Sequence, residues 1–70
     1  MNSEYCVRLK TYDEYVLEYG YANYSYLGWG NLVKVSPTDN DILLLGIIID
    51  GANAGKRIYV LKSAIKEYIS

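Results

Sequence analysis

The chain has 70 residues, a formal net charge of −1 and 51% apolar residues, among them nine tyrosines. This length predicts a single domain spanning residues 1–70. Cys6 is the only cysteine and histidine is absent, so an internal disulfide is excluded and a four-ligand zinc site is disfavoured. A small core must then be stabilised by dense packing or by oligomerisation, and we expect a homodimer or larger assembly.

The charged residues are unevenly distributed. Residues 1–50 hold seven acidic and three basic side chains, whereas residues 51–70 hold four basic side chains and one acidic. The near-neutral total argues against bulk electrostatic binding of nucleic acid, which relies on several cations contacting phosphates. The basic C-terminal end keeps a smaller nucleic-acid contact open as an alternative.

Two features of the sequence bear on localisation. The lone cysteine and the absence of a signal-peptide pattern predict a cytoplasmic, reducing environment. The longest apolar stretch, Ile42–Ile49, has eight residues between two aspartates. A membrane-spanning helix needs about 20 residues, so no membrane partner is expected.

The N-terminal segment predicts a half-buried strand. Apolar and polar side chains alternate over residues 2–10, which is the pattern of a strand with one face in the core. Tyr5, Val7 and Leu9 share one side of this strand. That side is expected to face the core.

The tyrosine-rich stretch that follows supports two interpretations. Thr11 and Glu14 have the spacing of a capping box, and Gly20 could end a helix at about residues 12–19. Residues 15–26 also alternate tolerably as a strand, and tyrosine is enriched in strands. We favour the strand and keep the helix as the alternative.

The second half of the chain predicts strands separated by turns. Gly28–Gly30 predicts a turn, residues 31–35 a short strand, and residues 36–41 a polar loop. Residues 42–49 are apolar on both faces, which predicts a central strand covered on both sides. Gly46 within this strand suggests a bulge or bend.

The C-terminal third predicts a hairpin and a short helix. Residues 50–55 form its loop and residues 57–61 its return strand, after which Ser63 caps a short C-terminal helix. These assignments predict a set of largely buried core residues. They are Leu43, Leu45, Ile47, Ile49, Val60 and Ile65.

Together these elements predict a mainly β fold with about five antiparallel strands, barrel-like or strongly bent, and a short C-terminal helix. A helix at residues 12–19 would make the fold α+β. Over residues 28–70, the order of glycine turn, strand, loop, strand, turn, strand and terminal helical turn resembles the rhythm of SH3-like small barrels. This resemblance implies a fold and no particular function, since such folds host many.

No catalytic, cofactor or metal motif stands out. The glycine-rich segment 51–57 is similar to a phosphate-binding loop, but three residues separate its glycines where four are needed, and a strand follows. Asp39–Asp41 lacks the remaining ligands of a calcium loop. Cys6 has no histidine to activate it as a nucleophile. We therefore expect no enzyme activity, no cofactor and no metal.

The most distinctive feature is a group of aromatic residues within an 18-residue stretch. Tyrosine and tryptophan are enriched at interface hot spots, and acidic residues between them favour a protein partner over a phosphate backbone. We expect a non-enzymatic protein-interaction module, for example a virus- or mobile-element-encoded inhibitor that covers a host protein's surface. The partner-binding candidates are Tyr12, Tyr15, Tyr19, Tyr21, Tyr24, Tyr26 and Trp29.

The alternative hypothesis is a small nucleic-acid-binding barrel. It would combine exposed aromatic residues, on which unpaired bases stack, with the basic C-terminal end of the chain. The candidate contacts are Lys56, Arg57, Lys62 and Lys66. A steep loss of affinity with added salt would distinguish this hypothesis from binding to a protein.

Overall fold

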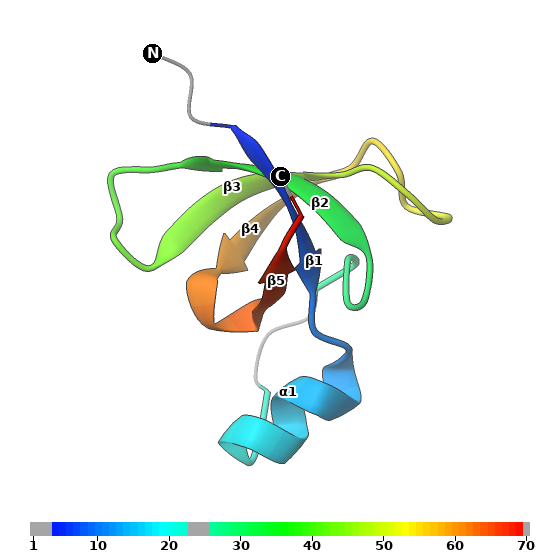
Figure 1. The fold of residues 1–70 in the computed structure, drawn as a ribbon, viewed down its shortest axis with the longest axis vertical. Coiled ribbons are helices and arrows are strands. Elements are labelled where there is room, and N and C mark those ends of the chain that lie inside the picture. The colour runs from blue at the N-terminus through cyan, green and yellow to red at the C-terminus, as the bar shows by residue number, and fades with distance from the viewer. Residues whose placement is uncertain (1–3, 23–25, 70) are drawn as a thin grey trace.

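The computed structural model describes residues 4–22 and 26–69. Its elements are β1 (Tyr5–Leu9), α1 (Tyr12–Tyr19), β2 (Leu32–Pro37), β3 (Leu43–Ile48), β4 (Arg57–Leu61), a 3-10 turn (Lys62–Ala64) and β5 (Ile65–Tyr68). The five strands form one antiparallel sheet in the order β4-β3-β2-β1-β5 (Figure 1). The predicted mainly β fold with five antiparallel strands is confirmed. The sheet is open, with β4 and β5 as its edges.

The centre of the sheet is built on β1 and β2. Val7 lies opposite Val33 and Tyr5 opposite Val35, so their side chains share one face. Both of these β2 valines are fully buried, as are Val7 and Leu9 of β1. The alternation predicted for the N-terminal strand is confirmed. It arises because β1 pairs on both sides, with β2 and β5, and buries only one face.

The helix α1 forms where a strand was favoured, and that preference was wrong. Both halves of the capping box are present: the Glu14 N–H donates to Thr11 Oγ1, and the Thr11 N–H donates to Glu14 Oε1. Gly20 ends the helix in the left-handed conformation, with φ of 86°. The predicted strand would have placed Leu17 on the same side as Tyr15, whereas the helix buries Tyr15 and leaves Leu17 exposed.

Strand β3 faces the core with the opposite side to the one predicted. Leu44 and Ile48 are buried, whereas Leu45 and Ile47 are each 38% exposed. The strand is therefore covered on one face only. Among the other predicted core residues, Val60 and Ile65 are buried, Leu43 is half-buried and Ile49 is exposed.

Gly46 accounts for the orientation of β3. It lies opposite Val35 in an uninterrupted register, so the predicted bulge is absent at this position. A Cβ at Gly46 would lie 2.6 Å from Val33 Cγ1. The backbone of β3 thus approaches the core valines closely, and Gly46 is on the inner face because only glycine leaves them room. Its neighbours along the strand must then point outward.

The C-terminal segment also differs from the prediction. Ser63 lies in a single 3-10 turn, and β5 replaces the expected helix. The Lys10 N–H donates to the Ala64 carbonyl, and the Ile69 N–H donates to the Cys6 carbonyl. This pairing satisfies backbone groups of β1 that a C-terminal helix would have left without a strand partner. Tertiary pairing therefore outweighed the local helical pattern.

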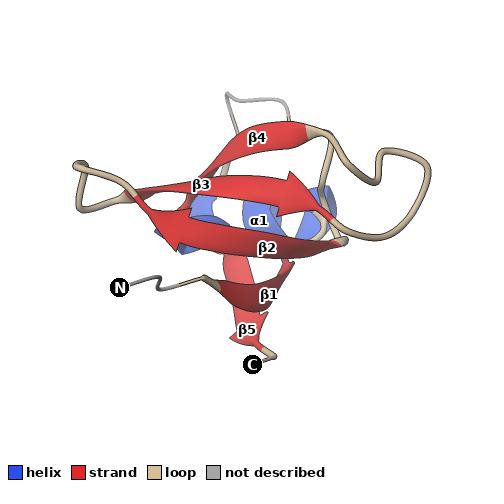
Figure 2. Ribbon diagram, turned by 90° about the horizontal axis from the view of Figure 1, so that it is seen from above, coloured by secondary structure: helices blue, strands red, loops and turns tan. Residues whose placement is uncertain are grey.

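The two faces of the sheet have different surroundings. Seen from above, β2 and β3 lie in front and α1 lies behind them (Figure 2). The register places the buried residues of β1–β4 on one face of the sheet. This face is on the helix side, because Gly28 lies close to a buried isoleucine of β3 while the adjacent Trp29 packs on α1. The opposite side, which we call the outer face, carries Leu45 and Ile47 of β3 and Tyr59 of β4. No described helix or strand covers the outer face.

The orientation of β3 can be tested with two adjacent isoleucines. Ile48→Ala should lower the free energy of unfolding by about 2–5 kcal/mol, because it leaves a cavity in the core. Ile47→Ala removes the same atoms from the outer face and should cost no more than about 1 kcal/mol. Urea titration of both variants measures the difference. Equal losses, or a larger loss for Ile47→Ala, would contradict the orientation of the strand.

Candidate interaction surfaces

Four of the predicted contact residues pack on one another. The ring centroid of Trp29 lies 5.8 Å from that of Tyr12, 5.4 Å from Tyr15 and 4.8 Å from Tyr26. Trp29 is thus the centre of this group, and Tyr15 is its most buried member, only 4% exposed. Aromatic pairs at such distances stabilise a fold beyond the area they bury. This aromatic cluster therefore connects α1 to the turn that precedes β2.

The hydroxyl groups of the cluster are also used within the fold. The Leu61 N–H at the end of β4 donates to Tyr26 Oη at 2.9 Å. Tyr15 Oη and Ser63 Oγ are hydrogen-bonded at 3.2 Å. Burial raises the pKa of Tyr26, and the hydrogen bond with Leu61 offsets part of that rise. Both tyrosines thus join distant parts of the chain to the corner after β4.

The other aromatic candidates are Tyr19, Tyr21 and Tyr24. Tyr19 and Tyr21 are exposed, as is part of the clustered Tyr12, so these rings are accessible to a partner. Tyr24 lies outside the described residues. The aromatic stretch that looked uniform in the sequence is therefore partly structural and partly surface. Residues 12, 15 and 19 share one face of the helix, so their spacing alone could not separate these roles.

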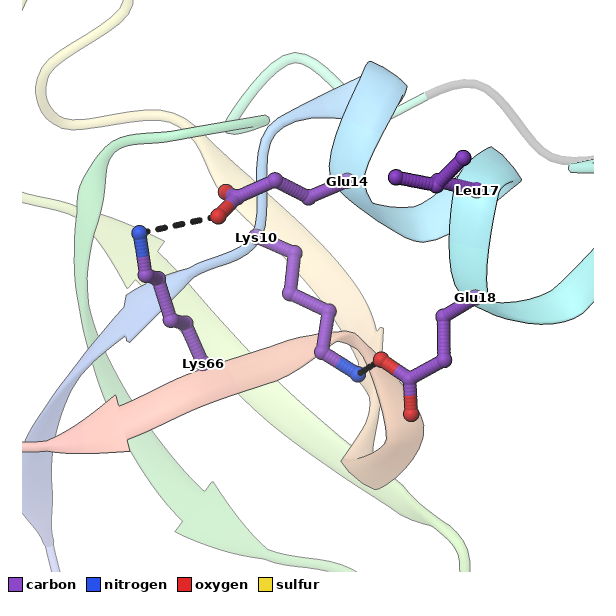
Figure 3. Close-up of a pocket in the computed structure, with 5 residues that line it drawn as sticks. All are labelled: Lys10, Glu14, Leu17, Glu18 and Lys66. Atoms are coloured by element: carbon purple, nitrogen blue, oxygen red, sulfur yellow. Dashed lines mark hydrogen bonds and ion pairs between the residues drawn. The ribbon is translucent and has the colours of Figure 1, made fainter.

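A shallow depression of about 390 Å³ lies beside α1, between the helix and β5 (Figure 3). Its lining residues are Lys10, Glu14, Leu17, Glu18 and Lys66. Lys66 Nζ lies 2.9 Å from Glu14 Oε2, and Lys10 Nζ lies 2.7 Å from Glu18 Oε1. The four charges thus compensate one another in pairs. This arrangement attaches the helix to the sheet and leaves little net charge for a ligand.

Lys10 is the most constrained of these charged groups. Its Nζ also donates to the Ser63 carbonyl at 2.9 Å and lies 4.9 Å from the ring centroid of Tyr19. Burial alone would lower the pKa of Lys10, but the hydrogen bonds with Glu18 and Tyr19 outweigh it and raise the pKa. The cation is held between helix and corner, where it stabilises the contact.

Both glutamates of the depression have lowered pKa values. For Glu14 the main cause is the hydrogen bond from the Thr11 backbone, followed by that from Lys66. For Glu18 the main cause is the hydrogen bond from Lys10. A carboxyl group whose pKa is lowered in the folded state stabilises the fold most when it is ionised.

The four basic residues proposed for nucleic acid do not form one cluster. Lys56 and Arg57 precede and begin β4, and Lys62 follows its last residue. A five-residue strand places its two ends about 13 Å apart. Lys66 lies on β5, where it is paired with Glu14. The structure therefore divides these cations among separate places on the surface.

The outer face carries the exposed apolar residues that the sequence assigned to the core. Leu45 lies opposite Tyr59, and Ile47 lies between Lys34 of β2 and Arg57 of β4. Directly opposed residues of adjacent strands are in side-chain contact range. Leu45, Ile47 and Tyr59 thus form an apolar patch with cations next to it. Ile49, just beyond the end of β3, is exposed as well.

Within residues 4–22 and 26–69, no three potential metal-ligating side chains gather, and no membrane-spanning helix is found. Cys6 is a free, half-buried cysteine on β1. Comparison with protein-family models, curated proteins and solved structures found no match to this chain.

The ion pairs beside α1 predict a dependence of stability on pH. Because both glutamate pKa values are lowered on folding, their stabilisation is complete above about pH 4.3, the ordinary value, and is lost as the pH falls through the lowered values. The melting temperature of Glu14→Gln/Glu18→Gln should therefore fall less than that of the wild type between pH 6 and pH 3. Part of the dependence should persist, since Asn31 and the Leu32 N–H also lower the pKa of Asp50. Identical profiles for both proteins would contradict this role.

The structural role of the aromatic cluster can be tested separately. Trp29→Ala should cost about 2 kcal/mol or more in unfolding free energy, because the ring contacts three tyrosines. Tyr21→Ala removes an exposed ring and should change stability by no more than about 0.5 kcal/mol. Thermal unfolding followed by circular dichroism measures both. A stable Trp29→Ala variant would show that the ring is available for binding.

Proposed function

We propose that this chain is a small, non-enzymatic protein-interaction module that binds its partner through the outer face of β3 and β4. One observation carries the proposal: Leu45, Ile47 and Tyr59 are exposed together on a sheet face that no described element covers. Contiguous apolar surface of this kind is typical of protein-binding sites. A module of this size would act by covering its partner's surface, as an inhibitor does.

The outer face has the composition of a protein interface. Tyr59 supplies a large ring with a polar tip, which is common among interface hot spots. Arg57 and Lys34 border the apolar patch and can select a partner by charge. The separation of Lys56 from Lys62 and Lys66 favours this proposal over nucleic acid, since a phosphate backbone needs several cations acting together.

We further propose that the sheet is an open relative of the SH3-like small barrels. Supporting this, a helical turn joins β4 to β5 along the chain, as the order of elements in the sequence suggested. These two strands are the edges of the sheet. In this comparison the terminal helical turn is the short segment Lys62–Ala64 and not a full helix. The fold carries no functional inference by itself.

The binding face can be tested by photo-crosslinking. A benzophenone amino acid would replace Tyr59 on the outer face or, as the matched control, Tyr68 on β5. The two tyrosines are 63% and 61% exposed, so the probes are equally accessible. We expect protein adducts from position 59 in lysate of the native host, unchanged by nuclease treatment, and few from position 68.

Two results would contradict the proposal. Equal labelling from both positions would show that position 59 has no preference for a partner. Adducts that disappear after nuclease treatment would favour the nucleic-acid alternative, since the contact would then depend on DNA or RNA.

A further inference from the structure

We propose that the chain associates with itself head to tail, with α1 of one copy lying on the outer face of the next. The inference rests on the proposed function, because it assigns a second copy of this chain as an occupant of the outer face. Two surfaces of the same molecule carry it. One is an acidic helix with an exposed leucine, and the other is an apolar sheet face bordered by cations.

The helix offers an unusual apolar side chain. Leu17 is 90% exposed, the largest value among the exposed large hydrophobic residues of the described chain. Around it, α1 has three acidic residues and no basic residue in its eight. Asp13 lies four positions before Leu17, so both project from the same side of the helix. Glu14 and Glu18 are paired with Lys66 and Lys10, so Asp13 supplies the negative charge that this side offers beside Leu17.

The outer face offers the complementary arrangement. Ile47 has Lys34 as its neighbour on one side and Arg57 on the other. Lys34 lies 3.8 Å from Glu4, at the long end of an ion pair, and no ion pair involving Arg57 is present among the described residues. An apolar centre with cations on either side matches Leu17 and the neighbouring Asp13 in both polarity and sign.

The dimensions of the two surfaces also agree. A helix with its side chains is about 10–12 Å wide, and three adjacent strands span about 10 Å. One copy of α1 can therefore cover β2, β3 and β4 at their middle. Eight residues make about 12 Å of helix, so the contact is small and its affinity should be modest. Added salt should weaken it further by screening the charges.

The placement of the two surfaces determines the form of the assembly. In Figure 2, α1 lies behind β2 and β3, so the outer face and the helix are on opposite sides of the sheet. Two copies cannot satisfy both contacts at once in a closed twofold pair. A heterologous contact of this kind produces open chains of copies unless the rotation closes a ring.

The test uses sedimentation of the full chain with two variants that each disable one surface. Leu17→Lys places a cation on the helix, and Arg57→Glu/Tyr59→Thr reverses the charge and removes the ring on the outer face. Lys62→Glu is the control for charge reversal, since Lys62 lies outside both surfaces. Circular dichroism and melting temperature confirm that each variant is folded.

We expect the wild type and Lys62→Glu to form assemblies that grow with concentration and shrink at raised salt. Each disabling variant alone should associate at least tenfold more weakly. An equimolar mixture of the two should form a dimer and nothing larger, since one intact helix then meets one intact outer face. This recovery on mixing is specific to a head-to-tail contact.

Three results would overturn the inference. A wild type that stays monomeric up to the order of 1 mM has no such contact. Association abolished by Arg57→Glu/Tyr59→Thr but unaffected by Leu17→Lys would indicate pairing of two outer faces. Disabling variants that fail to associate on mixing would also reject the contact. If the chain is monomeric while position 59 still crosslinks another protein, this inference fails and the proposed function stands.

Discussion

Several hydrogen bonds converge on the short corner between β4 and β5, and the position of the helix depends on them. The Ser63 carbonyl accepts from Lys10 Nζ, and the Ser63 hydroxyl is bonded to Tyr15. The adjoining Leu61 N–H donates to Tyr26. This short corner is thus hydrogen-bonded to the segment before α1, to the helix itself and to the segment before β2. These bonds join residues that lie 35 to 53 positions apart in the chain.

This constraint determines which surfaces are available to a partner. The corner and the helix use Tyr15, Tyr26 and Trp29 to fill the space between them, so these rings belong to the fold. The apolar residues of β3 that point away from the core have no such use. A chain this small cannot bury all its apolar side chains, and part of the excess, namely Leu45, Ile47 and Tyr59, lies together on the outer face. The proposed interaction surface follows from this part of the excess.

Much of the architecture could be predicted from local pattern. The capping residues Thr11 and Glu14 indicate the helix, whereas the β propensity of tyrosine favours the strand that did not form. The orientation of β3 could not be predicted, because a strand that is apolar on both faces carries no alternation. Its orientation depends on Gly46 and a valine 13 positions earlier. The final strand was missed because its partner, β1, lies at the other end of the chain. The division of the aromatic residues needed the tertiary contacts.

The close approach of Gly46 to Val33 also has a consequence for how this sequence can change. The two residues share one small volume, since a Cβ on the first would meet a methyl group of the second. The glycine is required by space and not by backbone conformation, as its φ is not positive. Divergent versions of this domain could therefore carry alanine at 46 only when position 33 is smaller. Positions 33 and 46 should therefore covary, so that a substitution in β3 depends on the residue present in β2.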